Sequence, residues 1–553
     1  MFTIESGQKA LFVILMYIFV WGEVDVKYFV KVLIVPVICC MMIGLMLPAA
    51  VAGSPIYFED GQQVEQPADR PLKDLKVLTP AQDGYQRFSD YALGYRLDIP
   101  AGMQLDMSLS ALRTVAYNND TRIEIYYDNF NSSASCTSAV AFINYNNKFL
   151  NNTRDHHLLE KSFMQSDDVS YYLLRWTRDK LSRVDNDHNY YARAHYVVSP
   201  QEVYTVWIKS ARPIENYERI FSSFTRVNKQ GAPGYFVRFK PMEHEWNEST
   251  RDFYEQYFNK EAALTWGIFE PTAPDSFNYL FQLEKQFDYS FPVILVYKSM
   301  DSSMPISDLQ RAYDQGKVVE LTLQTSSFEL GDADNQRLTY DILQGVYDEF
   351  FHQYARQIKS FGKPVLFRLN NEMNGDWCSY SSYYTGGDTE LFKALWRYVF
   401  DIFASEQIDN VIWVWNPHDL SFPDFKWNHA YMYYPGDQYV DVVGLTGYNT
   451  GNYYPGETWR EFPVIYDLLV RSYASVFDHP FMITEFGSNS VGGDKKAWID
   501  NMFANIDRYP QIKMAVWWNG VDWDSQMRPA RIYRIDENPA VINAFKNGLA
   551  DKQ

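Results

Sequence analysis

The chain has 553 residues, a length that predicts two domains at ordinary domain sizes. Hydrophobic residues make up 46% and charged residues 22%, which is usual for a soluble globular protein. The formal net charge is −19 and no Lys/Arg-rich stretch is present, so the composition argues against nucleic acid as a partner and favours a neutral ligand over a polyanion.

The first 52 residues contain two apolar runs, at 11–21 and 32–52. The second run follows Lys27 and Lys31 and ends in Ala50-Val51-Ala52. A basic flank, an apolar run and closing small residues are typical of a secretory signal that is cleaved, here before Gly53. An uncleaved membrane anchor is the alternative, because the run is long enough to span a bilayer. We therefore expect a protein that is secreted, or anchored to the membrane or cell envelope, with a start site downstream of Met1.

The next part of the chain predicts a linker followed by a small domain. Residues 53–84 carry Pro, Gln and Asp without periodicity, which is typical of a linker. Residues 85–228 contain short alternating runs such as Tyr95, Leu97 and Ile99, then a helical pattern at 214–224. This pattern predicts an accessory α+β domain with an antiparallel sheet and shows no catalytic motif. Residues 228–234, rich in Gly and Pro, mark its end.

From residue 235 to 550 the pattern changes to β-rich runs that alternate with helical stretches. The β-rich runs are 266–270, 293–297, 318–323, 365–369, 411–415, 442–445, 481–485 and 514–518, and helices are predicted at 347–361, 390–403, 459–477 and 495–508. This alternation predicts a (β/α)8 TIM barrel. A doubly wound open sheet is the rival, but it would more usually place a glycine-rich loop after the first strand, and none follows Glu270.

Glutamates follow two of these predicted strands. Glu372 comes just after the fourth run and Glu485 ends the seventh. Active sites of such barrels lie at the carboxyl ends of the strands, so the two side chains should meet at one mouth. Cleavage of a glycosidic bond needs one carboxylic acid to protonate the leaving oxygen and a second carboxylate at the anomeric carbon. A single strand-end glutamate is more often a structural ion pair, but two in these positions favour a hydrolase.

Four motifs in order resemble glycoside hydrolase family 26, over about residues 240–550. They are Glu-Met-Asn-Gly-Asp-Trp at 372–377, Trp-Val-Trp-Asn-Pro at 413–417, the stretch 434–444, and Thr-Glu-Phe-Gly at 484–487. The resemblance implies a retaining glycosidase in which Glu372 is the acid/base and Glu485 the nucleophile. It also implies an endo-acting β-1,4-mannanase that needs no cofactor.

Five further residues are candidates for contact with the polysaccharide or with the two glutamates. Arg368 lies four positions before Glu372, where strand alternation would place both on one face, and we expect it to orient a carboxylate. Tyr448 is expected to hydrogen-bond the nucleophile. The other candidates are Asn371, Trp377 and Trp518, the two tryptophans as sugar platforms, with simple packing as their alternative.

Asn371 departs from the family pattern, which usually has His before the acid/base. The resemblance to the wider clan implies that the Asn amide contacts the sugar 2-hydroxyl, which is axial in mannose and equatorial in glucose and xylose. A β-1,3/1,4-glucan or a xylan therefore remains a rival substrate, and a catalytically retired carbohydrate-binding envelope protein a rival function. No metal is expected, since His418, His429 and His479 lack metal-ligand spacing.

Overall fold

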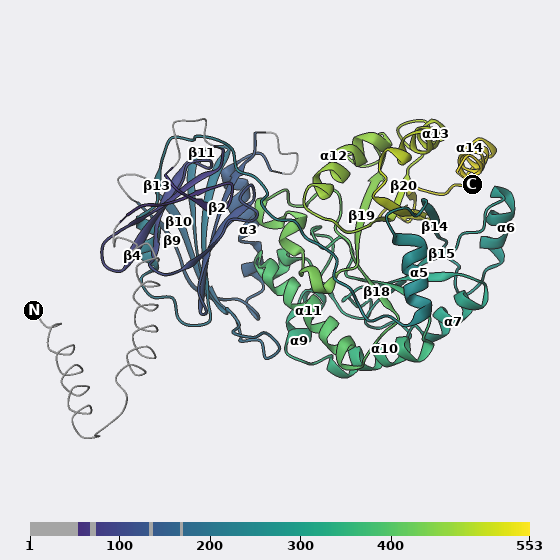
Figure 1. Cartoon of the computed structure of the whole chain (residues 1–553), viewed down its shortest axis with the longest axis horizontal. Helices are drawn as coiled ribbons and strands as arrows, with labels where there is room; N and C mark the ends of the chain where they lie inside the picture. The colour runs from purple at the N-terminus through teal and green to yellow at the C-terminus, as the bar shows by residue number, and fades with distance from the viewer. Residues whose placement is uncertain (1–53, 67–72, 132–135, 166–169, 553) are drawn as a thin grey trace, which may run out of the picture. The chain divides into compact units, whose positions relative to one another are not determined.

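The computed structural model describes residues 54–66, 73–131, 136–165 and 170–552 (Figure 1). The predicted signal or anchor at 1–52 lies outside these residues. Within them, no helix is both long enough and apolar enough to cross a bilayer.

The first part of the chain forms two sheets. A six-stranded sheet has the order β13-β5-β4-β3-β1-β2, and a seven-stranded sheet has the order β6-β7-β8-β12-β11-β10-β9 with every neighbouring pair antiparallel. The strands are β1 (Ile56–Glu59), β2 (Gln62–Val64), β3 (Leu75–Pro80), β4 (Tyr85–Asp90), β5 (Tyr95–Pro100), β6 (Gln104–Asp106), β7 (Arg113–Tyr117), β8 (Thr121–Asn129), β9 (His157–Met164), β10 (Tyr171–Thr177), β11 (Tyr190–Ser199), β12 (Glu202–Ser210) and β13 (Thr225–Arg226). The helices are α3 (Ala139–Asn146) and α4 (Tyr217–Ser222), as expected for an α+β domain with antiparallel sheets.

The linker prediction for 53–84 was wrong, because β1, β2 and β3 lie in that range and belong to the six-stranded sheet. The alternation of a half-exposed strand is absent from β3 because its first four residues are all buried. Among them is Lys76, whose ammonium pairs with the carboxylates of Asp74 and Asp90 at 2.5 and 3.2 Å. From sequence alone a lysine is expected to be exposed to solvent, so a lysine that is buried with two ionic partners hides the strand.

The second part is a closed barrel of eight parallel strands in the order β14 to β21. The strands are β14 (Thr265–Phe269), β15 (Val293–Lys298), β16 (Val318–Leu323), β17 (Val365–Leu369), β18 (Val411–Trp415), β19 (Val442–Asn449), β20 (Phe481–Ser488) and β21 (Ile512–Trp518). Helices surround them, as Figure 1 shows: α5 (Glu248–Phe258), α6 (Asn278–Phe287), α7 (Ile306–Asp314), α8 (Asp332–Asn335), α9 (Leu338–Leu343), α10 (Asp348–Phe361), α11 (Thr389–Ser405), α12 (Phe462–Ala474), α13 (Lys495–Asn505) and α14 (Pro539–Ala550). The predicted TIM barrel is confirmed, and a short hairpin of β22 (Val521–Trp523) and β23 (Pro529–Ile532) follows its last strand.

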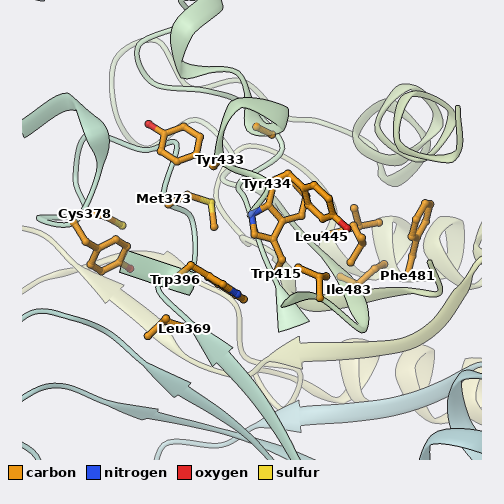
Figure 2. Close-up of a cluster of buried hydrophobic side chains, with 14 of the residues drawn as sticks. Leu369, Met373, Cys378, Trp396, Trp415, Tyr433, Tyr434, Leu445, Phe481 and Ile483 are labelled. Atoms are coloured by element: carbon orange, nitrogen blue, oxygen red, sulfur yellow. The ribbon is translucent and has the colours of Figure 1, made fainter. Parts of the chain in front are cut away.

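A buried apolar cluster supports the loops that follow β17 and β18 (Figure 2). Leu369 ends β17, and Met373 in the following loop is fully buried in the same cluster. Trp415 ends β18, and its ring meets that of Tyr434 edge-on at 5.3 Å. Because protein interiors are close-packed, these side chains hold the two loops in one position over the end of the barrel.

Candidate active site

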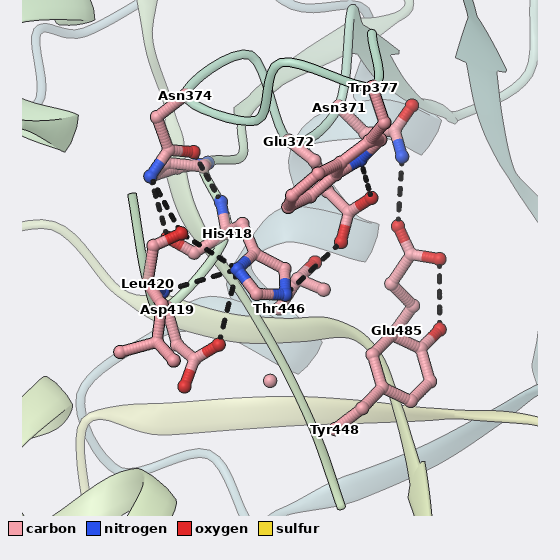
Figure 3. Close-up of polar contacts among 12 residues, drawn as sticks. Asn371, Glu372, Asn374, Trp377, His418, Asp419, Leu420, Thr446, Tyr448 and Glu485 are labelled. Atoms are coloured by element: carbon pink, nitrogen blue, oxygen red, sulfur yellow. Dashed lines mark hydrogen bonds and ion pairs between the residues drawn. The ribbon is translucent and has the colours of Figure 1, made fainter. Parts of the chain in front are cut away.

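The Glu485 carboxylate, on β20, accepts hydrogen bonds from four donors (Figure 3 shows two of them). Its Oε1 accepts from the Arg368 guanidinium at 2.9 Å and from the Asn371 amide at 3.1 Å. Its Oε2 accepts from the phenols of Tyr448, at 3.1 Å, and Tyr297. These donors occupy both carboxylate oxygens and hold the Glu485 side chain in one position at the end of the barrel.

Arg368 is completely buried inside the barrel and links the side chains of Glu485 and Glu320. Its Nη1 donates to Glu485, and its Nε lies 3.3 Å from Oε1 of Glu320, on β16. Burial raises the pKa of Glu320 to about 8, although the nearby guanidinium opposes that shift. Glu320 is therefore mainly neutral at pH 7, which leaves the guanidinium charge directed toward Glu485.

Glu372 lies in the loop after β17, with its backbone in the left-handed region at φ +54°. Its N–H donates to the carbonyl of Asn416 at 2.8 Å. Burial, with a further contribution from the Glu485 charge, raises the pKa of Glu372 to about 7. His418 and the indole N–H of Trp377, which donates to Oε2 at 3.2 Å, oppose the rise. Glu372 thus carries a proton through mildly acidic pH, as a general acid must.

The argument from strand alternation for Arg368 and Glu372 was wrong. The strand ends at Leu369, and both Asn370 and Glu372 have positive φ, so the chain turns between the two side chains. Arg368 points into the barrel and contacts Glu485 rather than Glu372. The expectation that Arg368 orients a carboxylate agrees with this contact.

Asn371 has its amide held in one orientation. Its Oδ1 accepts from the Gln324 amide at 2.9 Å and from the Tyr380 hydroxyl at 3.2 Å, so its NH2 faces Glu485. One N–H of that group is used by the carboxylate, and the second remains as a donor beside Glu485.

The two predicted platforms have different surroundings. Trp377 is 50% exposed and packs against His418 and Phe422 at centroid distances of 5.2 and 5.4 Å. Trp518 ends β21 and stacks on Phe269 at 5.1 Å with 13° between the rings. Both lie at the carboxyl end of the barrel, and Trp377 offers the larger free surface.

The sequence analysis did not identify three residues that contact the two glutamates or their partners. Tyr297 and Glu320 lie on β15 and β16, where the only available signal was a polar residue within a β-rich run. His418 was considered only as a metal ligand, yet its Nε2 lies 3.8 Å from Oε1 of Glu372. The described residues contain no group of three or more His, Cys, Asp or Glu side chains arranged to hold a metal ion.

Comparison with known proteins gives a family match within the barrel and several curated relatives. Residues 315–490 match the model of glycosyl hydrolase family 26. Endoglucanase H of Acetivibrio thermocellus is 28% identical over 245 residues, covering 43% of this chain and 25% of that protein. A mannan endo-1,4-beta-mannosidase of Bacillus subtilis is 32% identical over 186 residues, covering 32% of this chain and 43% of that protein. The matches thus span less than half the length of these curated relatives.

Among solved structures, the Bacillus subtilis mannanase BCman is similar at 19% identity and a TM-score of 0.38, covering 53% of this chain and 91% of that one. The family model covers the motifs around both glutamates. Over residues 315–490, the barrel of this chain is thus similar to glycosyl hydrolase family 26.

Proposed function

We propose that this chain is an endo-acting glycoside hydrolase that cleaves a β-linked polysaccharide by double displacement, with β-1,4-mannan as the first candidate substrate. The observation that carries the proposal is the contrast between two carboxyl groups at one barrel mouth. Glu372 has its pKa raised to about 7, whereas Glu485 accepts four hydrogen bonds, one of them from a buried guanidinium. A raised pKa suits the carboxyl that donates a proton, and fixed donors hold the other carboxyl in place to attack the anomeric carbon.

In the first step, Glu372 gives its proton to the glycosidic oxygen as the bond to the anomeric carbon breaks. Glu485 attacks that carbon and forms a glycosyl ester, which removes its negative charge. Since that charge raises the pKa of Glu372, the pKa falls once the ester forms. Glu372 then takes a proton from water, whose oxygen attacks the same carbon and releases Glu485.

The donors around Glu485 have distinct tasks in this scheme. Arg368 and the phenols of Tyr297 and Tyr448 keep the carboxylate fixed before attack, so little reorganisation is needed at the transition state. The remaining N–H of Asn371 is available to the 2-hydroxyl of the sugar.

Mannan leads because relatives from Bacillus subtilis and Caldalkalibacillus mannanilyticus are mannan endo-1,4-beta-mannosidases. A β-glucan is the second candidate, and two observations favour it. Endoglucanase H matches over 245 residues. Asn371, with its NH2 facing Glu485, replaces the usual His beside the acid/base, at the place that senses an axial or equatorial 2-hydroxyl.

Hydrolysis of mannan, mixed-linkage glucan and xylan by the purified chain tests this proposal and selects the substrate. Glu485→Ala should lower turnover by at least about a thousandfold without loss of folding. Azide should rescue Glu372→Ala and yield a glycosyl azide of retained configuration, since Glu485 still forms the ester. Turnover that survives Glu485→Ala overturns the assignment, and glycan binding by the intact chain without turnover favours a retired, carbohydrate-binding protein.

We also propose that residues 1–52 direct the chain to the cell exterior or its envelope. The basic flank, the apolar run and the Ala-Val-Ala ending support this proposal. Amino-terminal sequencing of the mature protein tests it: a start at Gly53 indicates cleavage, and an intact terminus in the membrane fraction indicates an anchor. Recovery of the uncleaved chain from the cytoplasm would contradict both.

A further inference from the structure

The accessory domain contacts the barrel at several places, and two of them are the loops that carry the catalytic motif and its neighbours. These loops are residues 370–388, after β17, and residues 416–441, after β18. The first contains Glu372 and Trp377, and the second contains His418. Contacts to these loops can therefore affect the position of Glu372 as well as hold the two domains together.

Helix α3 contacts both of these loops. Ser138 caps its amino end by accepting from the N–H of Ala141, and the helix ends at Asn146. Phe142, Tyr145 and Asn146 are spaced by three and four positions and so share one face. Phe142 meets Phe425 at a centroid distance of 4.6 Å, and Asn146 Oδ1 accepts from the Trp427 indole at 2.8 Å.

Tyr145 reaches the loop after β17 directly. Its hydroxyl donates to Oδ2 of Asp376, the residue that precedes Trp377. The main-chain carbonyl of Asp376 accepts from Tyr384 at 2.6 Å, so this residue is held at both its side chain and its backbone. Burial and the Asp376 carboxylate raise the pKa of Tyr145, which keeps the phenol protonated as a donor.

Other bonds fasten the same two loops to the accessory domain. Arg193 donates to the carbonyl of Gly386 at 3.2 Å, and Lys209 pairs with Asp388 at 2.8 Å. In the second loop, the N–H of Lys426 donates to Asp128 at 2.8 Å. These contacts hold the outer parts of the loops, so removal of the Tyr145 hydroxyl should act locally beside Trp377.

We propose that Tyr145 is a positioning residue that holds Asp376 and thereby the indole of Trp377 against Glu372. The accessory domain is then an integral part of the catalytic mouth. Trp377 lies next to Asp376, and its N–H reaches Glu372 Oε2 at 3.2 Å. Movement of Asp376 is transmitted to this hydrogen bond over one peptide unit. The catalytic meaning of the inference rests on the proposed function, whereas the contact itself does not.

The test compares Tyr145→Phe with Tyr127→Phe in the full chain. Tyr127, on β8, also donates its hydroxyl to a carboxylate, that of Glu202, but both partners lie within the accessory domain. The control therefore loses the same kind of bond without a link to the barrel. Asp376→Asn, which keeps an acceptor oxygen, serves as the conservative variant, and Asp376→Ala removes the acceptor.

Hydrogen exchange of the backbone in residues 372–381 gives a readout that does not depend on activity. We expect faster exchange in Tyr145→Phe and Asp376→Ala, and wild-type exchange in Tyr127→Phe and Asp376→Asn. Unchanged exchange in Tyr145→Phe overturns the inference. If the wild-type chain cleaves none of the glycans tested, the proposed function fails, and hydrogen exchange still decides the role of Tyr145.

Kinetics supply the second readout. Tyr145→Phe should lower kcat/KM about three- to tenfold, which corresponds to about 1 kcal/mol, the typical net value of one hydrogen bond. The basic limb of its pH profile should move to higher pH, because the hydrogen bond from the Trp377 indole, which favours ionised Glu372, becomes weaker. The other charged or titratable neighbours of the Glu372 carboxyl are unchanged in this variant; they are His418, Arg368 and Glu485. Effects of Tyr145→Phe and Asp376→Ala should be non-additive in the double variant. Additive losses with an unmoved pH limb would refute the inference.

Discussion

Replacement of Trp377 by Phe separates the two tasks assigned to this side chain. Phe keeps an aromatic ring over the Glu372 carboxyl, so burial is largely retained, but it removes the indole N–H that donates to Oε2 at 3.2 Å. Such a bond favours the ionised carboxyl, and its loss raises the pKa from about 7. A net value of about 1 kcal/mol for the hydrogen bond corresponds to roughly 0.7 pKa unit.

The assay is the pH dependence of kcat/KM on the preferred oligosaccharide. Glu372 must carry a proton in the first step, so activity falls as pH rises through its pKa, and the basic limb should lie near pH 7 in the wild type. In Trp377→Phe the limb should move up by about half a unit to one unit, and kcat/KM at the optimum should fall through poorer contact with the sugar.

Trp523→Phe is the matched control. Trp523 lies in the β22–β23 hairpin and is 54% exposed, about as much as Trp377, and the contacts of Glu372 do not include it. Its replacement should leave the basic limb in place. A limb that stays or moves to lower pH in Trp377→Phe would refute the assigned role of the indole N–H.

Three further predictions concern stability and packing. The raised pKa of Glu372 means that its ionisation costs folding free energy as pH rises from about 4.5 to 7. The unfolding free energy of Glu372→Gln, compared with wild type by urea titration at pH 5 and 8, should therefore gain about 2.5 kcal/mol at the higher pH. A difference that does not depend on pH would contradict this. Gly375→Ala would place a methyl group 2.4 Å from the Trp377 ring and should lower kcat/KM at least about tenfold. The control Gly331→Ala, whose methyl group meets no atom within 4 Å, should leave kcat/KM unchanged. Equal kinetics of the two variants would argue against a fixed position of the Trp377 indole. Arg368→Met leaves the buried carboxylate of Glu485 without its cation and should cost about 3–5 kcal/mol in chemical denaturation, more than Arg368→Lys. Equal stability of the two variants would show that the charge is not needed there.

Much of the barrel was predictable because parallel strands buried on both faces appear as continuous apolar runs. The predicted bounds of β16, β17 and β18 coincide with those in the structure. The short strands before residue 85 were not predictable by the same rule. Lys76, in β3, is buried through ion pairs with residues near and far in sequence, so its polarity hides the strand.

The order of motifs in the sequence was enough to single out Glu372 and Glu485 and to place both at one end of a barrel. Only the tertiary structure decided their environments. Tyr297, Glu320 and Arg368 come from three different strands, and closure of the barrel brings them to Glu485. The same holds for Tyr145, which is separated from Asp376 by more than two hundred residues yet bonds to it. Burial and long-range contacts set the pKa values and the side-chain positions of these residues. Local sequence does not determine either property, because both depend on which distant segments of the chain pack against a group and exclude water from it.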